Sequence, residues 1–327
     1  MQIQKELTMY SKKLKASLYK YGTIAFFIGL VIFFTIKSPR FMSLANISNV
    51  LRQMSVVGIA TVGMTMIIIT GGIDLSIGSV VALSSVILAK LLVSGMSIIP
   101  AIIITLLAGA GLRLINAILI NKLNIPPLIA TLGTITIYRG LAYITTGGLS
   151  VFGFPEQFRF IGQGYIGGFP VPVIIQIIVY AIGFFILYKT PMGRYIYGIG
   201  SNENASYLSG INVKKVKYFV YIFSGILGAL AGVVTLSRIN SGLPNTATGF
   251  ELDVVTAVVL GGVSVKGGEG HLAGSIIGCL IIGVLSNGMI LLGIEEYYQM
   301  LVKGIVLIAA VGIDIKVRNT AKDGSHA

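Results

Sequence analysis

The chain has 327 residues, of which 55% are hydrophobic and only 11% are charged, and its mean hydropathy is +0.91. No soluble globular protein needs that much apolar surface, so the composition predicts an all-α, polytopic membrane protein. The apolar runs are continuous rather than alternating, which excludes a transmembrane β-barrel. The net charge of +13 suggests nucleic acid, but the lysines and arginines flank apolar runs. That placement follows the positive-inside rule and predicts cytoplasmic termini, with no nucleic-acid partner.

Continuous apolar runs predict about ten transmembrane helices. A basic segment, 1–20, precedes the first span, and the lack of a cleavage site after that span indicates that it is retained. Residues 38–53 are amphipathic and follow a helix break at Pro39. The expected spans cover about 21–36, 54–70, 77–93, 98–120, 126–146, 169–188, 217–236, 252–263, 272–293 and 297–313.

These spans form a single transmembrane domain, 21–313, followed by a cytoplasmic tail, 314–327. An external loop, 147–168, and a basic cytoplasmic loop, 189–216, interrupt the domain. The eighth span is short and contains glycine, so a re-entrant segment at 252–263 is the alternative to a full crossing.

A helix joint falls between the second and third spans. Gly71 and Gly72 are typical of a helix end, and Asp74 or Ser76 of a helix start. Each flanking span is about 17 residues, or about 25 Å of helix, so the joint lies near one membrane face. We expect Asp74 to cap the third span; contact with a cytoplasmic partner or a role in substrate or proton handling are the alternatives.

A second segment resembles this joint. The sequence IIITGGIDLSIGSVVALSS is similar to AVVLGGVSVKGGEGHLAGS, which pairs glycines 71–72 with glycines 261–262. Both segments are expected on the cytoplasmic side, which suggests a parallel internal repeat and conflicts with the alternative of a five-plus-five inverted duplication.

The cytoplasmic loop contains a short helix with both of its ends marked. Ser201 or Asn202 can cap the start and Gly210 can end it. A helix of two turns is marginal in water, so it must rest on its own membrane domain or on a partner protein. The candidate coupling residues are Asn202, Glu203, Asn204, Ala205, Ser206, Leu208, Ser209 and Gly210.

Polar residues near the external side suggest a pathway or a gate. Glu251 and Asp253 are expected at the outer end of the eighth span, where Arg238 offers a local salt bridge. External docking or a substrate gate is the alternative. Arg139 lies in the fifth span, with Thr131 and Thr134 on the same span, and must face an acid or a cavity.

Several motifs are missing from the sequence. It has no nucleotide-binding P-loop, no visible nucleophile triad and no obvious proton relay. His271 is isolated, so no metal site is expected, and the chain is not expected to be an enzyme or to bind a cofactor. An active transporter with this sequence must therefore obtain its energy from another subunit.

These motifs, taken in order, resemble those of the membrane permease subunits of ribose-type ATP-binding cassette sugar importers. The similarity covers nearly everything from about residue 40 to residue 313. The specific blocks are GGIDLSIG at 71–78, IPPLIATLG at 125–133 with Arg139-Gly140, NASYLSGI at 204–211, Glu251-Leu-Asp253, VVLGGVS at 258–264 and Gly267-Gly268.

The resemblance implies a pore in a bacterial inner membrane, formed by two permease subunits as a homodimer or heterodimer. It implies two further partners: a cytoplasmic ATPase, which would use ATP, and an extracytoplasmic sugar-binding protein. The helix Asn202–Gly210 would couple the permease to that ATPase. The expected substrate is a monosaccharide such as ribose, xylose or galactose; autoinducer-2 or nucleosides are the alternatives within the family, and an ion-coupled secondary carrier outside it.

The chain departs from the family pattern in the fourth span. Family members usually have a small residue at the position of Arg113, and Asn-Gly where this chain has Asn116-Ala117. A buried arginine costs about 2.5–3.5 kcal/mol at a membrane centre, so Arg113 is expected to snorkel to the cytoplasmic face. On that interpretation Arg113→Gly is tolerated or stabilising; the alternative is that Arg113 prevents tight packing of the fourth span.

Overall fold

The computed structural model describes residues 22–323, with side chains placed up to residue 316. The expected basic segment, 1–20, and the last residues of the tail, 324–327, lie outside the described residues. Within the described range, seven helices are long and apolar enough to cross a membrane. They are α2 (Leu44–Ile69), α4 (Ile98–Asn121), α5 (Pro127–Thr146), α7 (Val171–Lys189), α10 (Val213–Ile239), α12 (Leu272–Leu291) and α13 (Glu296–Asp323).

The remaining elements are shorter. Two of them are apolar helices, Gly22–Lys37 and α3 (Ile77–Val93). The others are η1 (Glu156–Phe158), α6 (Arg159–Gln163), α8 (Pro191–Ser201), α9 (Glu203–Leu208) and α11 (Phe250–Leu260), with one antiparallel hairpin of β1 (Tyr165–Ile166) and β2 (Phe169–Pro170). The chain is thus mostly helical and a multi-pass membrane protein, as the composition predicts.

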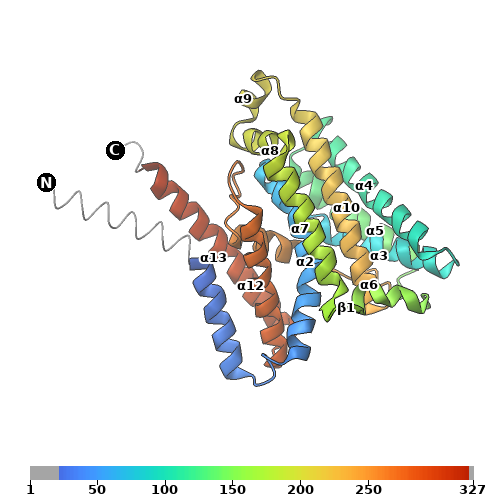
Figure 1. The fold of residues 1–327 in the computed structure, drawn as a ribbon. Coiled ribbons are helices and arrows are strands. Elements are labelled where there is room, and N and C mark those ends of the chain that lie inside the picture. The colour runs from blue at the N-terminus through green and yellow to red at the C-terminus, as the bar shows by residue number, and fades with distance from the viewer. Residues whose placement is uncertain (1–21, 324–327) are drawn as a thin grey trace.

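Helices α2 and α10 form the centre of the molecule (Figure 1). In α2, 89% of the most apolar window is buried, against 22% in α4 and 11% in α13. Close packing here depends on small residues, because Gly109 of α4 and Gly225 of α10 bring their backbones into contact. A Cβ added at Gly109 would lie 2.6 Å from the Gly225 carbonyl oxygen. Contacts of this kind are typical of helix packing in membranes.

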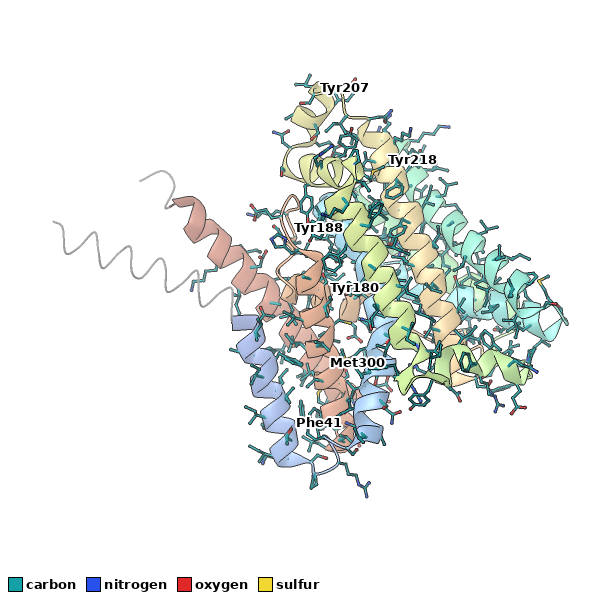
Figure 2. The ribbon with its side chains drawn as sticks, viewed as in Figure 1. Phe41, Tyr180, Tyr188, Tyr207, Tyr218 and Met300 are labelled. Atoms are coloured by element: carbon teal, nitrogen blue, oxygen red, sulfur yellow. The ribbon has the colours of Figure 1, made fainter. Side chains whose placement is uncertain are left out.

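The molecule has two distinct ends. Helices α8 and α9 lie at one end, and α6 with the β1–β2 hairpin lies toward the other (Figure 1). The helix Gly22–Lys37 and α13 run side by side on one flank. Phe34 and Phe41 pack together near the turn that leads into α2, with ring centroids 5.7 Å apart. Figure 2 shows Phe41 at the opposite end of the molecule from Tyr207 of α9.

Three boundaries differ from the sequence prediction. Helix α2 begins at Leu44, capped by the Ser43 side chain, so most of the amphipathic segment 38–53 is the first part of a 26-residue helix. The loop 189–216 contains α8 as well as α9, because Pro191 occupies the first turn of a helix, where proline is favoured. Helix α13 continues to Asp323, through most of the expected tail.

Candidate functional site

The joint after α2 is a Schellman helix end. Gly71 adopts a left-handed φ of +81°. Its N–H donates to the Ile68 carbonyl at 2.9 Å, and the Gly72 N–H donates to the Ile67 carbonyl at 3.0 Å. Glycine suits this position because it has no Cβ to oppose a positive φ.

The joint after α11 has the same geometry, but it is shifted by one residue relative to the pairing of glycines 71–72 with glycines 261–262. Here the left-handed residue is Gly262, with φ +84°, and it donates to the Val259 carbonyl at 2.8 Å. The next residue, Val263, donates to the Val258 carbonyl at 3.3 Å. Gly71 therefore corresponds to Gly262 rather than to Gly261, because the geometry of the helix end, not the paired glycine letters, sets the register.

Asp74 closes the turn that precedes α3. Its Oδ1 accepts hydrogen bonds from the Ser76 backbone N–H at 2.9 Å and from the Ser76 hydroxyl at 2.7 Å. Ser76 is the N-cap of α3, and its own side chain makes no capping bond. The carboxylate is fully buried, and its second oxygen forms an ion pair with Arg113. Asp74 thus orders the helix start with one oxygen and compensates a charge with the other.

Arg113 does not snorkel. Its side chain is 0% exposed, on the face of α4 that packs against α10, and its partner is the equally buried Asp74. Among the described residues, the phenols of Tyr138 and Tyr221 lie near enough to interact with it electrostatically. The expectation that Arg113 reaches the membrane surface is wrong. Asp74, at the joint between α2 and α3, compensates its charge inside the fold.

Hydrogen bonds extend this buried pair into a network. The Asn116 amide donates to the Ser76 hydroxyl at 2.8 Å. The Tyr138 hydroxyl lies 2.6 Å from the Leu112 carbonyl and 3.0 Å from the Asn116 side-chain oxygen. The network ties α4 and α5 to the start of α3, so this joint is fixed in place by buried polar contacts.

The threonines of α5 satisfy their hydroxyls locally. Thr131 is buried and donates to the Pro127 carbonyl at 2.9 Å, and Thr134 is buried and donates to the Thr131 carbonyl at 3.2 Å. Thr131 also lies 3.5 Å from the Ile73 carbonyl, beside the first joint. The structure therefore places Thr131 beside the helix joint, while Thr134 bonds within α5.

Arg139 contacts the loop that precedes α11. Its guanidinium donates to the Pro244 carbonyl at 2.8 Å and to the Thr246 carbonyl at 2.6 Å. Glu251, in the first turn of α11, is its electrostatic neighbour. The side chain thus serves as a clamp on the backbone between α10 and α11.

The two candidate acids of α11 have separate partners. Glu251 lies near enough to Arg139 to interact with it electrostatically, while Asp253 pairs with Lys303 of α13 at 2.8 Å. Within residues 22–316 neither acid pairs with Arg238, which was the expected local partner. The pairing differs because α13, distant in sequence, packs against α11 and brings Lys303 to it.

Helix α9 is a short, exposed helix at the end of the molecule. The Asn202 side chain accepts from the Ala205 N–H at 2.9 Å, and Gly210 adopts φ +84° just beyond the last turn. Lys217 of α10 pairs with Glu203 at 2.8 Å. Of the candidate coupling residues only Ser206 is buried; Asn202, Glu203, Asn204, Ala205, Leu208, Ser209 and Gly210 are exposed.

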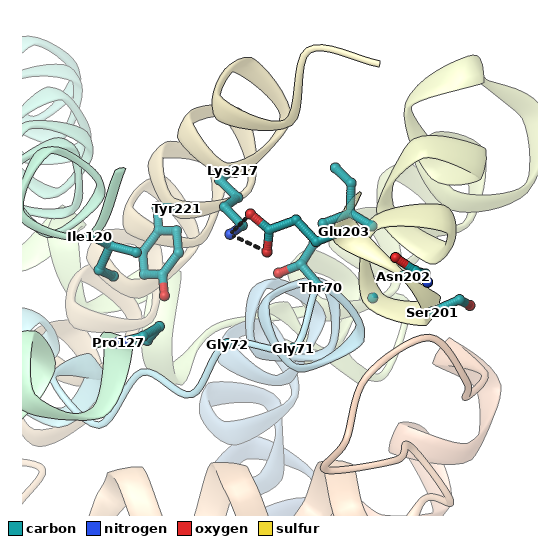
Figure 3. A pocket seen from close by; sticks show the side chains of 12 residues that line it. Thr70, Gly71, Gly72, Ile120, Pro127, Ser201, Asn202, Glu203, Lys217 and Tyr221 are labelled. Atoms are coloured by element: carbon teal, nitrogen blue, oxygen red, sulfur yellow. Dashed lines mark hydrogen bonds and ion pairs between the residues drawn. The ribbon is translucent and has the colours of Figure 1, made fainter. Parts of the chain in front are cut away.

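A cavity of about 340 Å³ separates α9 from the first joint. Figure 3 shows its lining, with Glu203 and Lys217 on one side and Gly71 and Gly72 on another. Tyr221, which also neighbours Arg113, completes the wall. The cavity therefore connects the exposed helix to the buried network.

Three tyrosines with important contacts in the structure could not be identified from the sequence. Tyr197 of α8 donates to the Gly270 carbonyl at 2.8 Å, and burial raises the pKa of its phenol. Tyr138 and Tyr221 gave no signal of their own, because one phenol within an apolar helix is ordinary. Among residues 22–323 no cluster of histidine, cysteine or acidic side chains could hold a metal ion.

In the part of the chain that the structure describes, seven apolar helices long enough to cross a membrane, packed around buried and partly buried ion pairs, define a multi-pass membrane protein. A family model described as "Branched-chain amino acid transport system / permease component" matches residues 46–311. The chain belongs to this family, and within it to the permeases of ribose-type ATP-binding cassette importers.

Curated relatives cover almost the whole chain. "Ribose import permease protein RbsC" of Bacillus subtilis (strain 168) is 45% identical over 289 residues, which is 88% of this chain and 90% of the relative. The protein of the same name from Escherichia coli (strain K12) is 40% identical over 306 residues, 92% of this chain and 95% of the relative. "D-allose transport system permease protein AlsC" of Escherichia coli (strain K12) is 38% identical over 297 residues, 90% and 91% of the two chains. No solved structure matches.

Proposed function

We propose that this chain is the translocation subunit of an importer for a monosaccharide, with ribose as the first candidate. Two copies, or this chain and a related permease, would form the pore in the bacterial inner membrane. A separate ATPase would bind the end that carries α9, and an extracytoplasmic sugar-binding protein would bind the other end. Curated relatives named for ribose, allose and arabinose support a monosaccharide substrate.

The observation that carries the proposal is the exposure of α9. Its last residues, Tyr207 and Leu208, are 71% and 84% exposed, at the tip of the molecule (Figure 2). Two adjacent exposed apolar side chains, one of them aromatic, are available here to contact a partner protein. The Glu203–Lys217 ion pair joins α9 to α10. A partner that binds Tyr207 and Leu208 can therefore displace α10 together with α9.

The buried charges favour an external motor over ion coupling. Asp74 pairs with Arg113, and Asp253 pairs with Lys303. A carboxylate that carries protons across a membrane must gain and lose its charge, and a fixed cationic partner opposes that change. The paired acids thus support a pore whose energy comes from ATP hydrolysis on another chain.

The test is reconstitution in liposomes with the P-loop ATPase and the secreted binding protein expected from neighbouring genes. Uptake of labelled ribose should require ATP inside and binding protein outside, and should continue when an uncoupler collapses the proton gradient. Allose, arabinose, xylose and galactose serve as competitors that define the sugar. Uptake that survives inactivation of the ATPase and stops with the uncoupler would instead establish an ion-coupled carrier.

The docking surface has its own test. Leu208→Glu on α9 should abolish co-purification with the ATPase, because a charge replaces an exposed apolar contact. Leu149→Glu is the matched control, since Leu149 is 73% exposed in the loop at the other end of the molecule. Equal co-purification of both variants would contradict docking at α9.

A further inference from the structure

Three segments that are distant in sequence meet at the base of α9. They are the end of α2 with Gly71, the end of α8 with Gly200, and the loop after α11 with Gly267 and Gly268. We call these four glycines the glycine junction. Most contacts in it are between backbones, with the short Ser201 side chain beside Gly268, so movement of one segment acts directly on the others.

Gly200 is the centre of the junction. A Cβ at this position would overlap both the Ile69 carbonyl oxygen of α2 and the Gly268 backbone nitrogen. Gly200 is also the second-to-last residue of α8, and Asn202, which caps α9, follows directly. Two residues therefore separate the tightest contact in the junction from the start of α9.

The loop after α11 connects the two helix joints. The Gly268 N–H donates to the Ile69 carbonyl at 2.8 Å, at the C-terminus of α2. A Cβ at Gly267 would lie 2.9 Å from the Gly71 nitrogen, and one at Gly268 would lie 2.8 Å from the Ser201 backbone. The left-handed ends of α2 and α11 are thus joined through a short loop that also touches α8.

Tyrosines of α7 and α8 hold the far end of this loop. The Tyr197 hydroxyl donates to the Gly270 carbonyl at 2.8 Å, and the Tyr188 hydroxyl accepts from the Leu272 N–H at 3.1 Å. The loop is therefore attached to α8 at two places, the Gly200 contact and the Tyr197 hydrogen bond.

We propose that the glycine junction transmits movement of α9 to both helix joints, so that Gly200 and Tyr197 couple the ATPase cycle to the opening of the pore. The proposal rests on the importer function proposed above. When the ATPase moves α9, α8 moves with it and displaces the ends of α2 and α11 together. The cavity of about 340 Å³ beneath α9 provides the space for that displacement.

The experiment measures sugar transported per ATP hydrolysed in the reconstituted complex. Gly200→Ala adds one methyl group at the junction, and we expect the ratio to fall about tenfold while ATP hydrolysis continues. Tyr197→Phe removes one hydrogen bond without adding volume, and we expect a fall of about threefold. A purely structural effect would lower transport and hydrolysis together and leave the ratio unchanged.

Matched controls lie in the same molecule. Gly111→Ala in α4 adds the same methyl group where nothing lies within 4 Å, and Tyr195→Phe changes an exposed tyrosine of α8. Both should keep the wild-type ratio.

The outcomes separate the two proposals. A wild-type complex that neither hydrolyses ATP nor moves sugar would overturn the importer function itself. A working wild type with an unchanged ratio in Gly200→Ala and Tyr197→Phe would overturn the junction alone. If Gly200→Ala fails to assemble, Tyr197→Phe decides, and a wild-type ratio in that variant rejects the proposal.

Discussion

Arg113 and Arg139 both lie within apolar helices, but the structure uses them in opposite ways. Arg113 is fully buried and pairs with a fully buried acid, Asp74, at the joint before α3. Arg139 is partly exposed and donates to backbone carbonyls of the loop that leads to α11. The first region is a closed network of charges and hydroxyls, and the second is a clamp on a loop.

The two arginines should therefore affect different properties of the protein. Removing one member of a buried ion pair leaves an uncompensated buried charge, which lowers the free energy of unfolding. Backbone carbonyls that lose a partly exposed donor can bind water instead, which limits the cost in stability. Arg113 should therefore control stability, while Arg139 should mainly control the position of the loop and of α11.

Arg113→Leu should have the largest effect. It leaves the Asp74 carboxylate buried and unpaired, at a cost of about 3–5 kcal/mol. The expected result is a large loss of folded protein, measured by the thermal midpoint in detergent. Arg113→Gly, which the sequence predicts to be tolerated, should behave likewise, and normal stability of either variant would contradict the pairing.

Asp74→Asn should be nearly as damaging alone, but it should rescue Arg113→Leu. The asparagine oxygen can still accept from the Ser76 N–H, so the turn is kept while Arg113 loses its counter-charge. The double variant has no buried charge and should recover most of the roughly 3–5 kcal/mol lost by each single change. A double-mutant cycle on thermal midpoints measures this coupling, and additive losses would show that the two groups act independently.

Arg139→Lys should separate the two regions. Lysine keeps the charge toward Glu251 but lacks the planar fork that reaches two carbonyls at once. We expect a stability loss of only about 1 kcal/mol, with a larger fall in sugar uptake. If its thermal midpoint falls as far as that of Arg113→Leu, the contrast between the regions is wrong.

Tyr138→Phe should lower stability about as little as Arg139→Lys. It removes the phenol that bridges the Leu112 carbonyl and Asn116 but leaves the ion pair in place. The expected loss is about 1 kcal/mol. Tyr143→Phe, an exposed tyrosine on the same helix, is the control and should leave the thermal midpoint unchanged.

The sequence predicts much of the helical framework because hydropathy and helix-end signals are local. Asn202 and Gly210 mark α9, and the runs after residue 77 correspond closely to α3, α4 and α5. Local signals predict the wrong boundary where a helix extends beyond the residues at which they would begin or end it. Helix α2 includes most of the amphipathic segment before it, and α13 runs through most of the expected tail.

Composition and motif order by themselves determined that this is a multi-pass membrane protein of the ribose-type permease family. The tertiary structure alone shows that Asp74 pairs with Arg113, that Asp253 pairs with Lys303, and that Gly71 corresponds to Gly262. The reason is physical. Burial of an apolar span depends on its own residues, whereas the partner of a buried charge depends on which helix faces come together.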